Sequence, residues 1–350
     1  MSNNSSQEQE PLIEIRNLEF GLDEQSKDRG KIPGLSLPYL SISPGHIYAL
    51  VGGSGCGKSL LLSLLSTFPP GTWKKPKQPE NFSFFWFGEK FSERDFGSAG
   101  KYSSKMRSVL DKSQGNIWYV PQHLPISRAD SVSVEKTLFE IVRATNPEKS
   151  LKEILDVAEK FFDKLNKKSG SRFFDWDKEQ HESVRKLSGG ERKRFEVCAR
   201  LIALNLFNQD GKALFLLDEP TAGLDPVRSR YFFEFIKNIS AEDEDVAFVI
   251  ATHDLQFLDT YADEIISIRR DDIDDETTTH LDESKTCCEI FCGKIGDYKK
   301  VFGGERGNAK TVLEIFERNN RRENGKNAES AGALQKRWKK QMPEIFNYQQ

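Results

Sequence analysis

The sequence predicts an α/β protein, and three observations lead to that prediction. Continuous apolar runs, typical of strands buried on both faces of a sheet, lie at 46–51, 213–217 and 247–251. A glycine-rich segment separates the first run from an apolar stretch of helical length that begins at Lys58. Residues 130–165 have helical spacing and contain no glycine. Strands and helices that alternate in this way favour a mostly parallel sheet.

The segments around these runs each predict an element. Residues 12–20 begin with apolar and charged side chains in near alternation, as half-buried strands do, and 36–42 are a second strand candidate. The aromatic run at 82–87 predicts a strand packed in a β layer, in preference to a surface for stacking nucleobases. The segment 92–113 is low in apolar residues and predicts an exposed insertion. The glycine-free stretch at 130–165 predicts a mostly helical lobe.

Length, charge and composition restrict the class of protein. A chain of 350 residues can build one large or two modest domains, and its net charge of -3 gives no global attraction to nucleic acid or acidic lipid. Residues 1–11 lack the basic start and apolar centre of a secretory signal, so a disordered leader is expected there. No run approaches the roughly 18 apolar residues of a spanning helix. The five cysteines do not suggest a disulfide framework, so a cytoplasmic setting is expected.

A phosphate-binding loop is predicted at 52–59, where the sequence reads GGSGCGKS. It satisfies the G-x-x-x-x-G-K-[ST] pattern, after a strand and before a helix. Glycines allow the backbone to turn its N–H groups toward one anion, and the helix adds its positive dipole end at the same point. Lys58 is expected to reach the β- and γ-phosphates of a nucleotide, and Ser59 to give a hydroxyl ligand to Mg²⁺. The predicted nucleotide contacts in the loop are Gly52, Gly53, Ser54, Gly55, Cys56, Gly57, Lys58, Ser59 and Leu60.

An acidic pair follows the apolar run at 213–217. Asp218 emerges at the carboxyl end of a buried strand, where it is expected to hold Mg²⁺. Glu219 faces a different way, which suits the general base for an attacking water. In isolation such a pair is more often the start of a solvated loop, but the phosphate loop reverses this preference. The sequence therefore predicts nucleotide hydrolysis.

A second glycine-rich turn, LSGGE, opens a helix at 187–191. Apolar residues with the spacing of a helix follow it, so the N-terminus of this helix also presents N–H groups to an anion. One nucleotide cannot easily use both turns, because this one lies far along the chain from the loop at 52–59.

With these motifs the chain resembles the ATP-binding cassette (ABC) ATPases. LSGGE is similar to their signature motif, TAGLD at 221–225 to their D-loop, THD at 252–254 to their switch histidine, and YVPQ at 119–122 to their Q-loop, in the family's order. The resemblance covers roughly residues 12–270. It implies a P-loop NTPase (RecA-like) core with a mostly parallel sheet, an antiparallel β layer and a helical lobe at about 124–190.

The resemblance also implies roles for residues that mean little alone. His253 becomes the γ-phosphate contact, and Gln122 links Mg²⁺ or the attacking water to the helical lobe. Two subunits pair head to tail, so that Ser188 and Gly190 of one subunit close on the ATP held by Lys58 of the other. The implied roles are catalysis for Glu219, His253, Gln122 and Lys58, Mg²⁺ binding for Ser59, Gln122 and Asp218, and further nucleotide binding for Ser188, Gly189, Gly190 and Asp225.

Three positions depart from the family's pattern. Leu22 stands where an aromatic residue commonly stacks on adenine, and Phe20 is the candidate substitute. Leu60 stands where threonine is frequent, which removes one hydroxyl contact to phosphate, and Glu191 stands where glutamine is commoner. No catalytic residue is lost, so hydrolysis is still expected, with weaker or less adenine-selective binding.

The resemblance favours the ATP-hydrolysing subunit of an ABC transporter. Its expected partners are a second ABC subunit, in a homodimer, and a separate integral membrane permease at the inner face of a membrane; the stretch 131–142 resembles the start of the lobe that receives the permease. The alternative is a soluble ABC ATPase acting on nucleic acid or ribosomes, favoured only by the basic cluster LQKRWKKQ at 334–341, for which a solvated tail is the preferred interpretation. The ABC ATPase domain is expected at 12–306 and a partly disordered C-terminal extension at 307–350.

Overall fold

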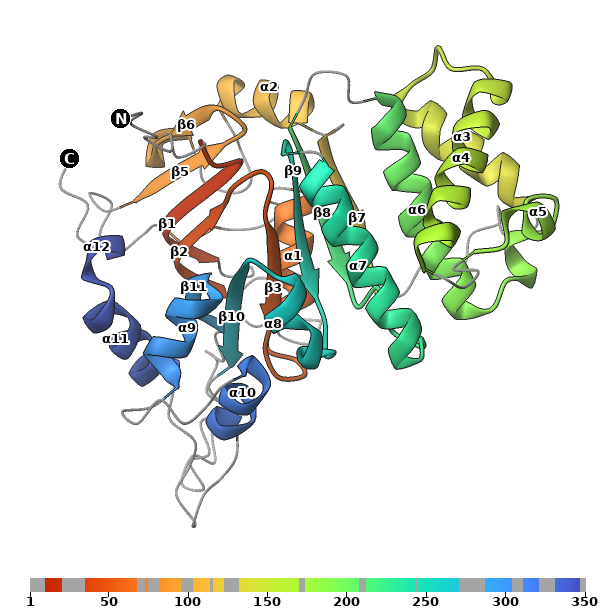
Figure 1. Ribbon diagram of the computed structural model, residues 1–350. Helices are drawn as coiled ribbons and strands as arrows, with labels where there is room; N and C mark the ends of the chain where they lie inside the picture. The colour runs from red at the N-terminus through yellow and green to blue at the C-terminus, as the bar shows by residue number, and fades with distance from the viewer. Residues whose placement is uncertain are drawn as a thin grey trace, which may run out of the picture.

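The structure is a computed structural model of the chain (Figure 1). It describes residues 10–20, 35–67, 73–74, 82–95, 103–113, 116–122, 132–169, 174–207, 212–242, 244–270, 287–303, 311–320 and 331–346. Most of the leader predicted at 1–11, and Leu22, lie outside these residues.

One mixed sheet runs through the described part of the chain. Its strands are β1 (Ile13–Phe20), β2 (Leu35–Ile42), β3 (Ile47–Val51), β4 (Trp73–Lys74), β5 (Ser83–Trp86), β6 (Glu89–Phe91), β7 (Ile117–Val120), β8 (Ala213–Asp218), β9 (Val246–Ala251), β10 (Glu264–Arg270) and β11 (Cys287–Lys294). They lie in the order β6-β5-β1-β2-β11-β10-β3-β9-β8-β7, and β4 pairs with β1. The strands from β10 to β7 pair in parallel, which confirms the predicted mostly parallel sheet.

Helices cover both faces of the sheet. They are α1 (Lys58–Thr67), α2 (Ser104–Ser113), α3 (Val134–Thr145), α4 (Leu151–Ser169), α5 (Trp176–Glu179), α6 (Gly189–Phe207), α7 (Pro226–Glu242), α8 (Leu258–Tyr261), α9 (Ile295–Phe302), α10 (Val312–Asn320), α11 (Ala331–Gln341) and α12 (Pro343–Phe346), with 3₁₀ turns η2 (Glu93–Asp95), η6 (Val184–Lys186) and η7 (Leu255–Phe257). Of the helices that the structure describes, none combines the length and the apolar character needed to cross a bilayer.

The sheet separates two hydrophobic cores. Alternate residues of β8 serve them, since Leu214 and Leu216 join the core that contains α1, whereas Phe215 joins the core that contains α6 and α7. The Phe215 ring stacks between Trp118 and Phe248 of the neighbouring strands, with centroid distances of 6.4 and 5.2 Å. Burial on both faces explains why these strands are continuous apolar runs in the sequence.

The antiparallel β layer extends this sheet. β1 pairs antiparallel with β2 and β5, and β5 with β6, while β2 joins the rest of the sheet through a parallel pairing with β11. Phe84 and Trp86 of the aromatic run are buried, as a strand packed in a β layer requires. The segment predicted as an exposed insertion is only partly so, because Met106 of α2 is buried in the core while its neighbour Arg107 is exposed.

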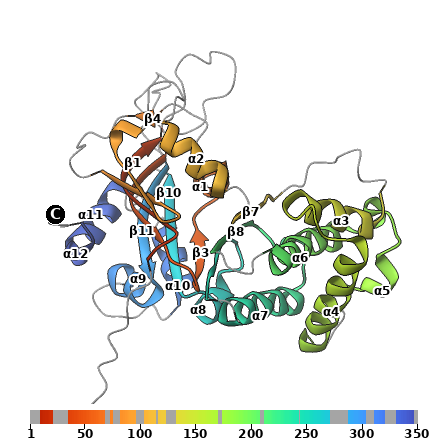
Figure 2. The same ribbon diagram turned by 90° about the horizontal axis from the view of Figure 1, so that it is seen from above.

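The helical lobe predicted at about 124–190 contains α3, α4 and α5, and α6, most of which follows residue 190, packs against α3 and α4 (Figure 1). The interior of the lobe is aromatic: the Phe162 ring lies 5.0 Å from the Phe174 ring and 5.1 Å from the Trp176 ring. The lobe lies at one end of the molecule and the C-terminal helices α11 and α12 at the other, in both views (Figure 2).

The C-terminal helix α11 packs on β11, which lies in the middle of the strand order. The Trp338 ring of α11 lies 5.4 Å from the Phe291 ring of β11 and 4.8 Å from the Phe346 ring of α12. Arg16 of β1 donates a hydrogen bond of 2.6 Å from Nη1 to the carbonyl of Ile345. These contacts tie the end of the chain to strands that lie far from it in sequence.

The interpretation of 334–341 as a solvated tail is wrong. Leu334 and Trp338, four residues apart and therefore on one face of a helix, are fully buried, whereas Lys336, Lys339 and Lys340 are exposed. The segment is an amphipathic helix whose lysines cover its outer face. Its basic composition therefore reflects a solvated helix surface around a buried tryptophan.

Candidate nucleotide site

The loop between β3 and α1 has the backbone that a phosphate loop requires. At Gly52 a Cβ atom would lie 2.3 Å from the Cys56 sulfur and 2.5 Å from the Ile268 carbonyl oxygen, so no side chain fits. Gly57 has a φ of 103°, which L-residues rarely adopt. The loop then enters α1 directly, where the Leu61 N–H donates to the Gly57 carbonyl at 2.9 Å. The chain thus turns the N-terminus of α1 toward the centre of the site.

Lys58 places a positive charge at this helix N-terminus. Its Nζ donates hydrogen bonds to the carbonyls of Gly52 at 2.9 Å and Gly53 at 3.3 Å, and the residue is buried. The loop backbone therefore orients the ammonium beside the N-terminus of α1. Together they form a binding site for an anion of high charge, such as a polyphosphate.

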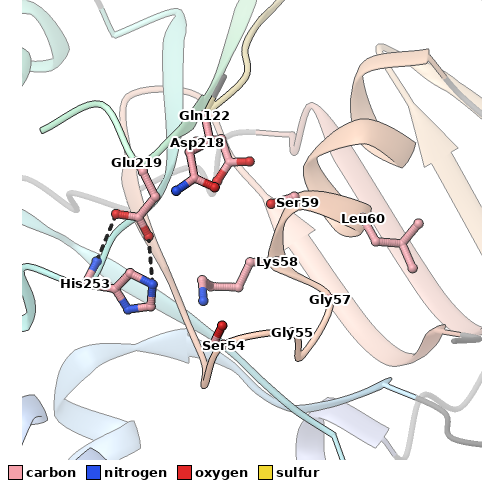
Figure 3. Close-up of a pocket in the computed structure, with 10 residues that line it drawn as sticks. All are labelled: Ser54, Gly55, Gly57, Lys58, Ser59, Leu60, Gln122, Asp218, Glu219 and His253. Atoms are coloured by element: carbon pink, nitrogen blue, oxygen red, sulfur yellow. Dashed lines mark hydrogen bonds and ion pairs between the residues drawn. The ribbon is translucent and has the colours of Figure 1, made fainter. Parts of the chain in front are cut away.

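A pocket of about 320 Å³ opens in front of this loop (Figure 3). Residues from four segments distant in sequence line it: Ser54, Gly55, Gly57, Lys58, Ser59, Leu60, Gln122, Asp218, Glu219 and His253. The topology explains this meeting, because β3, β7, β8 and β9 are parallel neighbours whose carboxyl ends share one edge. All the residues predicted for catalysis and for Mg²⁺ lie in this pocket.

Three oxygen donors in the pocket fit a magnesium ion. Ser59 offers a hydroxyl, Gln122 an amide oxygen and Asp218 a carboxylate, which are the hard ligands that Mg²⁺ prefers. Asp218 ends the buried strand β8 and is 3% exposed, so its carboxylate is directed by the strand. In Figure 3 the side chains of Ser59, Gln122 and Asp218 lie on the same side of the pocket, whereas Leu60 points away from Lys58.

Glu219 and His253 form a pair opposite Lys58. Glu219 Oε1 lies 3.3 Å from His253 Nε2, and the backbone N–H of His253 donates to Oε2 at 3.3 Å. Burial raises the pKa of the Glu219 carboxyl, while the charge and the backbone N–H of His253, and the charge of Lys58, act in the opposite direction. A raised pKa brings a carboxylate closer to the range in which it accepts a proton from water at neutral pH.

The signature turn lies outside this pocket. Among the described residues that line the pocket, none belongs to 187–191. Gly189 and Gly190 are the first residues of α6, and Ser188 and Glu191 form a capping box. The Ser188 hydroxyl and N–H donate to Glu191 Oε2 at 2.7 and 2.9 Å, and the Glu191 N–H donates to Ser188 Oγ at 3.3 Å.

The capping box gives Glu191 a local structural role that sequence reasoning missed. Hydrogen bonds from Ser188 lower the pKa of the Glu191 carboxyl, so the residue is a charged cap in the first turn of α6. The S-x-x-E spacing before a helix was the available signal for it. The departure from glutamine at this position therefore preserves the cap.

Asp225 and Phe20, which were predicted to contact the nucleotide, bond to neighbouring parts of the chain. Asp225 precedes Pro226, the first residue of α7, and its Oδ1 accepts hydrogen bonds of 3.0 Å from the N–H groups of Val227 and Arg228. It is thus the cap of α7, and its nucleotide contact stays a prediction. Phe20 ends β1, with its backbone paired to Leu35.

Fold and site together define the class of this protein. A mostly parallel sheet carries a glycine loop, a buried lysine, a strand-end aspartate and a glutamate–histidine pair to one pocket, as in P-loop nucleoside triphosphatases. The ABC transporter family model matches residues 37–222, which is more than half of the chain. The chain belongs to the ABC transporter family, and it is an ATPase.

Known relatives agree with this assignment. The chain is 26% identical over 259 residues to the zinc uptake system ATP-binding protein ZurA of Listeria monocytogenes, covering 74% of this chain and 83% of that protein. It is 27% identical over 291 residues to the sulfate/thiosulfate import ATP-binding protein CysA of Pectobacterium atrosepticum, covering 83% of this chain and 73% of that protein. These relatives support an ABC transporter subunit over the ribosome or nucleic-acid alternative.

A solved structure agrees on the fold. The structure of cbiO1 from Clostridium perfringens, part of the ABC transporter complex cbiONQ, is similar with a TM-score of 0.52 at 22% identity. The alignment covers 85% of this chain and 93% of that one. The predicted fold, a P-loop core with an antiparallel β layer and a helical lobe, is confirmed.

Proposed function

We propose that two copies of this ATPase pair head to tail, and that the signature turn of each copy completes the ATP site of the other. One observation carries this proposal: the pocket collects every predicted catalytic residue, whereas the signature turn lies outside it. That turn nevertheless opens α6, and Ser188 is exposed, so a phosphate group from elsewhere can reach the turn. A second copy supplies the ATP that this turn needs.

Within each site the residues divide the work of hydrolysis. Lys58 and the loop N–H groups bind the phosphates, and Glu219 accepts a proton from the attacking water. His253 holds Glu219 and contacts the γ-phosphate, and Gln122 connects the site to the helical lobe. Ser59, Gln122 and Asp218 would hold Mg²⁺, which when bound supplies charge neutralisation at the phosphate oxygens.

In this proposal, ATP hydrolysis is coupled to conformational change in a separate membrane permease. The cbiO1 structure is described as part of a transporter complex. In this proposal the chain acts at the inner face of a membrane. Residues 12–306 form the ATPase domain, and 307–350 are an extension. The helical lobe is the surface that would dock the permease and move with closure. The names of ZurA and CysA give different cargoes, which agrees with a cargo chosen by the permease.

The head-to-tail pairing is tested by crosslinking. Ser54 in the phosphate loop and Ser188 in the signature turn are both exposed. With both replaced by cysteine, a disulfide between chains is expected to form in the presence of ATP and Mg²⁺ and to be absent without nucleotide, as measured on non-reducing gels. A matched pair combines Ser54→Cys with Ser150→Cys, an exposed serine elsewhere in the helical lobe, and should not crosslink. Equal crosslinking by both pairs, or none by the first, contradicts this arrangement.

The membrane partner is tested by affinity capture of the full chain from detergent-solubilised membranes. An integral membrane protein is expected to co-purify and to be identified by mass spectrometry. Its retention should depend on the helical lobe. Recovery of soluble partners alone would overturn the transporter assignment of the partner and favour the ribosome or nucleic-acid alternative.

A further inference from the structure

A hydrogen bond joins the two loops that carry Glu219 and His253. The Thr221 hydroxyl, two residues after Glu219, donates to Asp254 Oδ2, one residue after His253, at 2.6 Å. Thr221 is 3% exposed and Asp254 is partly exposed, so this bond is partly shielded from water. Its two partners follow different strands, β8 and β9, and lie 33 residues apart in sequence.

The loop after β8 has a backbone that requires support from its surroundings. Glu219 has a φ of 51°, in the left-handed region that residues with a side chain seldom occupy. Its N–H donates to the Ala251 carbonyl at 2.9 Å, and its own carbonyl accepts from the Ala222 N–H at 3.1 Å. Such a conformation persists where neighbouring contacts hold it, and the bond from Thr221 to Asp254 ties this loop to the next in addition to the direct contacts of Glu219 with His253.

Asp254 also holds the loop after β9. The Asp254 N–H donates to the Thr252 hydroxyl at 3.0 Å, which closes a short turn around His253. The His253 side chain is largely exposed, so packing does little to fix the ring. The position of His253 relative to Glu219 therefore depends on their direct contacts, on the backbone of this turn and on the link from Asp254 to Thr221.

We infer that Thr221 and Asp254 are positioning residues whose hydrogen bond sets the distance between Glu219 and His253 for ATP hydrolysis. This inference rests on the proposed roles of Glu219 and His253. Neither Thr221 nor Asp254 lines the pocket among the described residues, so each acts through its neighbour. Lys58 donates to the carbonyls of Gly52 and Gly53, whereas Thr221 bonds to Asp254, so ATP affinity should be independent of the bond.

Thr221→Val, which replaces the hydroxyl by a methyl of similar shape, is the direct test. It should lower the ATPase kcat by about 10- to 100-fold, because small displacements of catalytic groups have effects of this size. The Kd for ATP, measured by calorimetry, should not change, and Thr221→Ser should restore most of the kcat. Asp254→Ala should have the same effect as Thr221→Val, and the double variant should be no slower than either single one.

A matched control separates positioning from general loss of stability. Ser240→Ala also removes a buried hydroxyl, whose hydrogen bond of 2.9 Å reaches the Gly45 carbonyl at the other end of the sheet. It should lower the melting temperature to a similar extent and leave kcat unchanged. If Thr221→Val does not fold, Asp254→Ala measures the same loss from the other partner.

The outcomes distinguish this inference from the proposed function. Normal turnover in both Thr221→Val and Asp254→Ala, turnover in Thr221→Ser as low as in Thr221→Val, or additive losses in the double variant would each overturn the inference. If Glu219→Gln abolishes turnover in the same experiment, the proposed base assignment stands although the positioning bond does not. If Glu219→Gln turns over normally, the proposed function fails first.

Discussion

Glu219→Gln is expected to lower the ATPase kcat by about 10²- to 10⁴-fold, which is the usual contribution of a general base. Glutamine keeps the shape of the side chain and its bond to the His253 N–H, but it cannot accept a proton from water. Lys58 and the phosphate loop are unchanged, so ATP should still bind. The variant should therefore accumulate as an ATP-bound dimer, measured by light scattering with and without ATP.

Glu264→Gln is a close control for this experiment. Glu264 also pairs with a histidine, since its Oε1 lies 3.2 Å from His46 Nδ1, but the pair lies at the opposite end of the strands from the pocket. Both variants remove the charge of a partly buried glutamate that pairs with a histidine. Only Glu219→Gln changes a residue of the nucleotide pocket. Turnover should be normal in Glu264→Gln. Near-normal turnover in Glu219→Gln would show that another group accepts the proton.

Several residues of the site were predictable because their signals are local, whereas the roles of Gln122 and His253 came from the resemblance to the ABC ATPases. The phosphate loop needs glycine at fixed places. At Gly52, a Cβ atom would lie too close to the Cys56 sulfur and to the Ile268 carbonyl oxygen. Asp218 follows a fully buried strand, and a buried parallel strand delivers the next residue to the edge where the phosphate loop lies. Such constraints act within a few residues of sequence, so one chain is enough to identify them.

Contacts between distant segments were beyond the reach of sequence reasoning. The hydrogen bond from Thr221 to Asp254 exists because β8 and β9 are neighbours in the sheet, and no local pattern specifies which side chains meet after them. The same limit explains the continuity of the antiparallel layer with the parallel strands. That continuity depends on the pairing of β2 with β11, which are separated by most of the chain.

The end of the chain is the clearest case, because composition alone pointed away from the structure. Lysines at 336, 339 and 340 suggest a solvated tail, but Leu334 and Trp338 share the opposite face of the helix and are fully buried. The surface that receives them is built from Phe291 of β11 and from α9. Without knowledge of that surface, one tryptophan among lysines does not indicate burial.

Trp338→Ala is therefore expected to destabilise the whole protein by about 3–5 kcal/mol, the usual cost of truncating a buried tryptophan. The cost arises from lost contacts with the rings of Phe291 and Phe346 and from the cavity left between them. Because Trp338 belongs to the same core as α1, the effect should appear in the midpoint of urea unfolding of the full chain, followed by tryptophan-independent circular dichroism. Lys336→Ala, an exposed change two residues away on the same helix, should leave the midpoint nearly unchanged. Equal midpoints for the two variants would mean that α11 does not contribute to the core.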